Sequence, residues 1–152
     1  MITKDLIHEA QKKWGEGIVK IGTLKNNDSE CIKYTTSFLN EMYDFDNVVL
    51  FKPTKASVEQ FRPTFKMALS YFIGGHDSFC SEDDGFAMKP WIEVKFENSG
   101  YIIDDSIAIA MGNYFFKDSS NKEVKVEFTF GYKLNDDKLI IVLHHSSLPF
   151  LS

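Results

Sequence analysis

A regular alternation of apolar and polar residues between positions 124 and 133 constrains the fold of this chain more than any other feature. The apolar positions are Val124, Val126, Phe128, Phe130 and Tyr132, and lysine, glutamate, threonine or glycine stands between them. Because successive side chains of a β-strand point to opposite faces, this pattern predicts a strand with one buried face. Residues 135–137 predict a hairpin turn, and residues 139–147 predict the last strand, which Pro149 closes.

Two further strands are predicted before this hairpin. Residues 91–96 alternate with period two, whereas residues 106–116 are apolar at nearly every position. A continuous apolar run predicts a strand with both faces covered. A shorter β-branched run at residues 48–51 predicts a buried strand that Pro53 ends.

Helical spacing dominates the first half of the chain. Apolar residues recur every three or four positions over residues 7–21, which predicts one amphipathic helix. A second helix, capped by Asp28 or Ser29, would bury Cys31, Thr35, Phe38, Leu39 and Met42. A third helix would have Pro63 in its first turn, would share one face among Thr64, Met67, Ala68 and Tyr71, and would end at Gly74-Gly75.

The order of these elements, helices first and then an antiparallel meander, predicts an α+β fold with the helices packed on one face of a curved sheet. We find no internal repeat, low-complexity tract or domain boundary, so we expect residues 1–152 to form a single domain.

Charge and composition exclude several classes of partner. The formal net charge is −5 and the sequence has no basic run, so neither nucleic acid nor an anionic membrane surface is expected to bind. No stretch approaches the roughly 18 apolar residues of a membrane span. The N-terminus lacks the pattern of a signal or transit peptide. Cys31 and Cys80 are expected to be unpaired thiols, and we therefore expect a cytoplasmic protein.

The last strand carries the clearest candidate site. Strict alternation should place His144 and Ser146 on one face with Ile140 and Val142. The other face should hold Leu139, Ile141, Leu143, His145 and Ser147, so the two histidines are badly placed to chelate one metal ion. Two polar groups at the end of an apolar strand could hold a water molecule or a small anion. On the residues alone, a core histidine with satisfied hydrogen bonds is the favoured interpretation of His144.

Other chemically capable residues have ordinary explanations. Arg62, the sole arginine, stands between Phe61 and Pro63, where it is expected to meet a carboxylate, more readily a structural one than one on a ligand. Core packing explains Tyr71 and Thr64, and turn chemistry explains Thr54. The metal-capable residues His76, Asp77, Cys80, Glu82, Asp83 and Asp84 match neither a zinc nor a calcium spacing. A solvated acidic loop is the favoured interpretation there.

Seven strings, in this order, resemble the iota-class carbonic anhydrases. They are VLFKPT (49–54), FRPTF (61–65), ALSYF (68–72), GFAMKPW (85–91), AMGNYFF (110–116), FTFGY (128–132) and HHSSLP (144–149). That family is itself similar to the association domain of calcium/calmodulin-dependent kinase and has the cone-shaped nuclear transport factor two-like fold. The resemblance spans about residues 14–150. The HHSS ending occurs in both groups, whereas the KPW and RPT strings favour the anhydrases.

The resemblance implies a cavity between the helices and the concave sheet. A threonine, a tyrosine and a serine of the family contact the substrate or bound anion, with a histidine near the serine. They match Thr54, Tyr71, Ser146 and His144, with Thr64 as a rival for the threonine. Tyr114 and Phe115 would wall the pocket, and Thr64 and Arg62 are further candidates for substrate binding.

The resemblance implies reversible hydration of carbon dioxide to bicarbonate, so the expected partner is this small molecule. A zinc ion lowers the pKa of its bound water from about 15.7 to about 7. A site without metal needs another proton acceptor, and a neutral histidine near its usual pKa of about 6.5 suits that role. No third histidine shares the face of His144, so we expect no cofactor, with zinc or manganese as the alternative.

A non-catalytic reading remains open beside the enzymatic one. The two-sided strand at residues 106–116 predicts a sheet face that pairs with a second copy, as a homodimer or higher homo-oligomer. An oligomerisation or small-ligand-binding domain, similar to the kinase association domain, would need no catalytic residues. An isomerase or cyclase pocket is a weaker alternative, because it requires a buried carboxylate base and we identify none.

Overall fold

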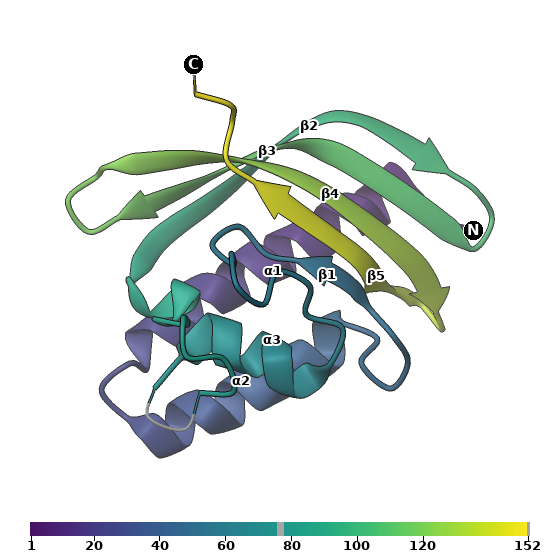
Figure 1. The fold of residues 1–152 in the computed structure, drawn as a ribbon. Helices are drawn as coiled ribbons and strands as arrows, with labels where there is room; N and C mark the ends of the chain where they lie inside the picture. The colour runs from purple at the N-terminus through teal and green to yellow at the C-terminus, as the bar shows by residue number, and fades with distance from the viewer. Residues whose placement is uncertain (76–77, 152) are drawn as a thin grey trace.

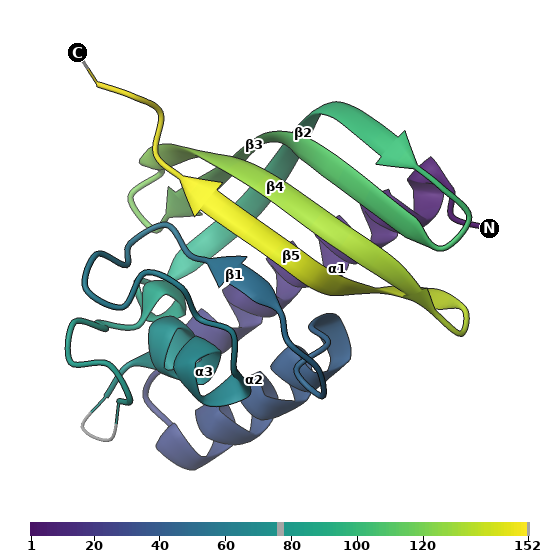
Figure 2. The same ribbon diagram turned by 45° about the vertical axis from the view of Figure 1, so that its right-hand side comes forward.

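A computed structural model describes residues 1–75 and 78–151. Three helices lie on one side of a curved five-stranded sheet (Figures 1 and 2). This confirms the predicted α+β arrangement. Among the residues described, none of the helices is long and apolar enough to cross a membrane.

The two long helices have polar N-caps. In α1 (Lys4–Thr23), the Thr3 side chain accepts a hydrogen bond from the backbone N–H of Leu6. In α2 (Asp28–Met42), Asn27 caps the helix, one residue before the predicted Asp28 or Ser29. The Asn27 side-chain oxygen accepts a hydrogen bond from the N–H of Glu30. Asp28 and Ser29 already lie inside the first turn and so are not the cap. The predicted buried face of α2 is confirmed in full.

Helix α3 (Phe65–Ile73) begins two residues after Pro63, which therefore stands outside its first turn. Thr64 is the N-cap, and its hydroxyl accepts from the N–H of Met67. Gly74 ends the helix with a φ of 56°, a conformation that favours glycine, which confirms the predicted stop. The short 3-10 helix η1 (Phe86–Met88) follows.

The sheet has the strand order β1-β5-β4-β3-β2. Its strands are β1 (Leu50–Lys52), β2 (Trp91–Ile103), β3 (Ile107–Asp118), β4 (Glu123–Asn135) and β5 (Lys138–Ser147). The last four form an antiparallel meander, and β1 joins the edge of β5 in parallel, pairing Phe51 with His144. This parallel pairing brings the end of β1, and Thr54 just beyond it, beside the end of β5.

The hydrophobic core lies between the helices and the concave face of the sheet. Phe128, Phe130 and Tyr132 of β4 point into it, as their alternation predicts, and all three are buried. Trp14 of α1 enters the same layer and stacks on Tyr114 of β3, with 5.6 Å between the ring centroids. The helices therefore cover one face of the sheet with large rings.

The prediction that β3 is covered on both faces is wrong for the single chain. Ala108, Ala110 and Tyr114 are buried, but Ile107 is 45% exposed and Met111 is 56% exposed. The helices reach the concave face alone, so the apolar side chains on the outer face meet solvent.

The predicted alternation of β5 is correct at its end and wrong before it. A bulge lies at Val142, because Gly131 pairs with Leu143 while Tyr132 pairs with Ile141. His144 and Ser146 therefore share the core face with Ile141 and Leu139, and not with Ile140 and Val142. Alternation read from the sequence assumes one register throughout, and the extra residue reverses it.

Candidate active site

Residues of α1, β1, α3, η1, β3 and β5 surround a small cavity at the end of β5. The inner cavity is lined by Trp14, Phe51, Pro53, Thr54, Tyr71, Phe72, Phe86, Tyr114, His144 and Ser146. The space open to the centre of a water molecule is about 10 Å³, so the cavity has room for about one water molecule. Thr54, Tyr71, Tyr114, His144 and Ser146, all named from the sequence, are thus brought together.

The hydroxyl of Ser146 is the meeting point of this cavity. Its Oγ lies 2.6 Å from Thr54 Oγ1 and 2.6 Å from the hydroxyl oxygen of Tyr114. The carbonyl oxygen of Glu127 lies 3.3 Å away and can accept from the serine. Three hydroxyl groups therefore converge in a buried space. Hydroxyls both donate and accept, so such a cluster can bind an oxyanion or pass a proton along.

His144 lies next to this cluster, and the hydroxyl of Tyr114 links it to Ser146. Its Nε2 lies 3.0 Å from the hydroxyl oxygen of Tyr114, and its Nδ1 lies 2.8 Å from the hydroxyl oxygen of Tyr43. The imidazole is stacked between the rings of Phe51 and Phe130, with centroid distances of 4.9 Å and 4.0 Å. Both ring nitrogens are therefore engaged, and both faces are covered by hydrocarbon.

The electrostatics of the cavity favour neutral groups. Burial lowers the pKa of His144 well below its usual value, and the nearby His145 lowers it further. Burial likewise raises the pKa of Tyr71 and of Tyr114 well above the usual range of a phenol. The histidine is thus a weaker base than the sequence led us to expect, and it stays uncharged at neutral pH.

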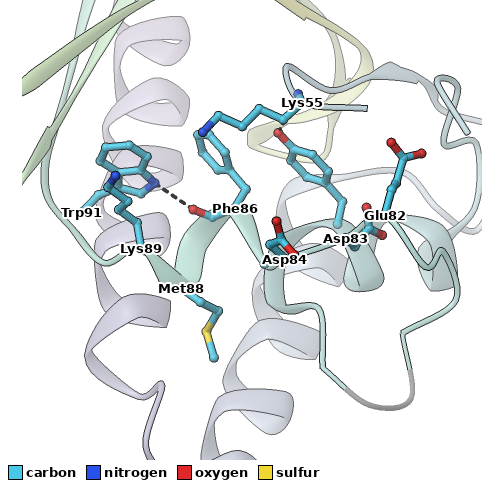
Figure 3. A pocket seen from close by; sticks show the side chains of 10 residues that line it. Lys55, Glu82, Asp83, Asp84, Phe86, Met88, Lys89 and Trp91 are labelled. Atoms are coloured by element: carbon cyan, nitrogen blue, oxygen red, sulfur yellow. Dashed lines mark hydrogen bonds between the residues drawn. The ribbon is translucent and has the colours of Figure 1, made fainter. Parts of the chain in front are cut away.

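A larger outer pocket has a volume of about 230 Å³ (Figure 3). It is lined by Lys55, Tyr71, Glu82, Asp83, Asp84, Gly85, Phe86, Met88, Lys89 and Trp91. The rings of Tyr71 and Phe86, stacked with centroids 5.6 Å apart, line both spaces. The indole N–H of Trp91 donates to the carbonyl of Phe86 and fixes this segment (Figure 3). These two rings are therefore shared by the inner cavity and the outer pocket.

Arg62 is buried away from the inner cavity and bound to a carboxylate of the protein, as the structural interpretation predicted. Its guanidinium makes two parallel hydrogen bonds to Asp83, of 2.8 and 2.9 Å. Two other site candidates also lie outside the inner cavity. Thr64 caps α3 at the surface, and Phe115 points to the outer face of β3, where Lys95 Nζ lies 5.4 Å from its ring centroid.

Two carboxylates of the acidic loop, those of Glu82 and Asp83, make structural contacts. The carboxylate of Glu82 accepts from the backbone N–H groups of Ser57, Val58 and Glu59, and these bonds lower its pKa to about 2. His76 and Asp77 of the predicted metal-capable set lie outside the described residues. Within residues 1–75 and 78–151, no three histidine, cysteine or carboxylate side chains are grouped so as to hold a metal ion.

Sequence reasoning missed two polar residues behind His144. Trp14 lies in the apolar stripe of α1, and Tyr43 is the C-cap residue directly after α2, so core packing accounts for both. The spacing of Leu39, Met42 and Tyr43 gives no sign that the Tyr43 hydroxyl meets a ring 101 positions later. This contact joins residues that are far apart in the sequence, so the residue pattern of a single helix cannot predict it.

Comparisons with known proteins identify the family that this chain matches. Residues 5–148 match the family model of the metal-independent carbonic anhydrases. A metal-independent carbonic anhydrase of Nostoc sp. is 37% identical over 155 residues, which cover 98% of this chain and 75% of the relative. The crystal structure of a cyanobacterial iota-carbonic anhydrase complexed with bicarbonate superposes with a TM-score of 0.94 at 35% identity, covering 99% of this chain and 94% of that one.

More distant structures share the fold alone. A calcium/calmodulin-dependent protein kinase II association domain of Xanthomonas campestris has a TM-score of 0.63 at 20% identity, covering 94% of this chain and 85% of that one. An NTF2-like protein of Shewanella oneidensis has a TM-score of 0.57 at 15% identity, covering 96% and 99%. These likenesses confirm the predicted cone-shaped architecture.

Proposed function

The chain belongs to the metal-independent carbonic anhydrase family, and from this premise we propose that it hydrates carbon dioxide reversibly at the hydroxyl cluster of the inner cavity. The observation that carries the proposal is the convergence of Thr54, Tyr114 and Ser146 within 2.6 Å contacts in a buried space. The similarity to a bicarbonate complex at a TM-score of 0.94 supports the same substrate class.

Preorganised hydroxyl donors suit the charge that develops on the oxygens of carbon dioxide. Hydrogen bonds aimed at such oxygens stabilise the transition state without reorganisation, and they are strongest where water is excluded. Ser146 and Thr54 supply two of these donors, and Tyr71 lines the same space. Their role in this proposal is to hold the attacking water and the substrate in reacting geometry.

The proton of the attacking water needs a route that creates no lasting charge in the cavity. In this proposal the water gives its proton to Ser146 Oγ while the Ser146 hydroxyl hydrogen passes to an oxygen of carbon dioxide. The water oxygen bonds to carbon, one carbon–oxygen double bond becomes single, and carbonic acid forms; it ionises to bicarbonate in solvent. His144 acts through Tyr114, which holds Ser146, and dehydration runs through the same atoms in reverse.

The donor set also supports chemistry without a metal ion. Metal centres of hydrolytic enzymes use histidine, cysteine or carboxylate ligands with one open position. Around Ser146 the candidate ligand would be His144, and both of its nitrogens are already engaged with tyrosine hydroxyls. We propose on this basis that the enzyme works without zinc or manganese.

The test is a stopped-flow assay of carbon dioxide hydration, with a pH indicator, on protein treated with a chelator. We expect Ser146→Ala to lose activity by about 100-fold or more, the scale of acid–base catalysis. Ser147→Ala is the matched control, because that neighbouring hydroxyl contacts the Glu127 side chain at the surface. Equal rates for Ser146→Ala and wild type, or an inert wild-type enzyme, would overturn the proposal.

A second matched pair tests the histidine. His144→Ala removes the buried ring, whereas His145→Ala removes an exposed ring from the opposite face of the same strand. We expect a large loss of hydration rate in the first variant alone. Similar rates for both variants would show that the strand end is not part of the catalytic cavity.

We also propose self-association through the outer face of the sheet, as a homodimer or higher homo-oligomer. The exposed apolar side chains of Ile107 and Met111 support it. Sedimentation of wild type and Met111→Glu tests it, because a charge on this face should produce monomers. A monomeric wild-type protein would refute the proposal. A cytoplasmic location and a single domain over residues 1–152 stay predictions.

A further inference from the structure

Two residues behind the cavity fix the direction of its hydrogen bonds. We propose that Tyr43, held by Trp14, is a positioning residue that keeps His144 as the tautomer protonated on Nε2 and so turns the Ser146 hydroxyl hydrogen toward the substrate. The inference rests on the proposed function for its catalytic consequence, but the tautomer itself is measurable without any activity.

The direction of these hydrogen bonds is fixed first at Trp14, because an indole N–H donates and never accepts. Its Nε1 lies 2.9 Å from the hydroxyl oxygen of Tyr43, so the tyrosine oxygen accepts here. Tyr43 is 1% exposed, and leaving its own hydroxyl hydrogen unpaired would cost free energy. The other contact of this hydroxyl is His144 Nδ1, at 2.8 Å. Tyr43 therefore donates to Nδ1.

A neutral imidazole carries one proton, on one nitrogen or the other. Since Nδ1 of His144 accepts from Tyr43, the proton must be on Nε2. Nε2 lies 3.0 Å from the hydroxyl oxygen of Tyr114, to which it donates. The ring is thus a donor on the side of the cavity, and it is not placed to accept a proton from water there.

The hydrogen bond from Tyr114 to Ser146 follows the same donor-to-acceptor direction. Having accepted from His144, Tyr114 donates its hydrogen to Ser146 Oγ at 2.6 Å. The hydrogen of Ser146 is then directed to Thr54 Oγ1, which lines the cavity, or to the backbone carbonyl of Glu127. With His144 protonated on Nδ1 instead, Ser146 could donate to Tyr114, and its hydrogen would be turned away from the substrate.

The titratable groups around His144 do not compete for this arrangement. Tyr43 comes from the end of α2, Tyr114 from β3 and Tyr132 from β4, and burial raises the pKa of each. His145 lies on the opposite face of β5. All three tyrosines therefore remain protonated over the pH range of the assay.

The experiment uses the full chain labelled with ¹⁵N on histidine, and it compares wild type, Tyr43→Phe and Tyr132→Phe. Tyr132→Phe is the matched control: Tyr132 is also 1% exposed, and its hydroxyl lies outside the chain of contacts that ends at Ser146. In wild type we expect His144 Nδ1 to have the ¹⁵N shift of an unprotonated nitrogen and Nε2 that of a protonated one. Tyr43→Phe should abolish this preference, and Tyr132→Phe should keep it.

Hydration kinetics give the second measurement. A histidine held as the wrong tautomer costs up to about 10,000-fold in turnover in the serine protease triad. We expect turnover to fall in Tyr43→Phe by no more than about 10,000-fold. Turnover in Tyr132→Phe should stay close to that of wild type. Thermal unfolding of each variant verifies that it is folded.

Three results would overturn the inference. They are a wild-type His144 protonated on Nδ1, an unchanged tautomer in Tyr43→Phe, and equal losses of turnover in both tyrosine variants. If wild type proves inactive, the proposed function fails while the nitrogen shifts still decide the tautomer. If Tyr43→Phe does not fold, the wild-type shifts and the indole N–H shift of Trp14 decide it.

Discussion

The stability of this protein should depend on pH through His144. The ring is fully buried between Phe51 and Phe130, and burial lowers its pKa well below 6.5. In the unfolded chain the same group takes up a proton near pH 6.5. Between these two pKa values the unfolded state binds one more proton than the folded state, so the free energy of unfolding falls as the pH falls.

The size of this effect follows from the linkage of one proton. Each pH unit inside the window changes the free energy of unfolding by about 1.4 kcal/mol. From pH 7.5 to 6.5 the contribution of His144 is nearly constant, and from pH 6.5 to 5.5 it should decrease by roughly 1 kcal/mol, approaching the full slope below that. Carboxylates with lowered pKa values, such as Asp44 and Glu82, change their protonation at lower pH than this.

Urea unfolding at pH 7.5, 6.5 and 5.5, followed by tryptophan fluorescence, measures the effect. His144→Gln removes the buried imidazole, and His145→Gln removes an imidazole exposed on the outer face. We expect the loss between pH 6.5 and 5.5 to disappear in the first variant and to persist in the second. A wild-type slope equal to that of His144→Gln would refute the reasoning that burial keeps this ring neutral.

Three further outcomes follow from particular contacts. Arg62→Met should cost about 3–5 kcal/mol in urea unfolding, because the carboxylate that this arginine binds would remain buried and unpaired. Gly17→Ala should cost about 1–3 kcal/mol by the same measurement, since its Cβ would lie 2.0 Å from the ring of Phe38. Gly100→Ala, whose Cβ meets nothing within 4 Å, is the control. Thr54→Val should lower the hydration rate without lowering the melting temperature by more than a few degrees, as stopped-flow kinetics and thermal unfolding would show; wild-type kinetics would contradict a role for this hydroxyl.

Local patterns in the sequence determined the elements of this fold. The period of 3.6 residues in α1 and α2 and the period of two in β4 both arise from chain geometry within one element. They therefore identify the buried faces, including the whole buried face of α2. The same alternation puts His144 and Ser146 on one face, and the family resemblance adds Thr54 and Tyr71, which line the same cavity.

Tertiary structure decided the contacts between elements. The bulge at Val142 reverses the alternation of β5, and no local pattern records it, because it arises from pairing with β4. Arg62 binds Asp83, and the Tyr43 hydroxyl contacts His144, because the fold brings segments that are distant in the sequence together. The sequence thus determined that His144 and Ser146 face the core together. The packing of a helix against the sheet decided that His144, named first as a base, is a buried donor whose direction Tyr43 sets.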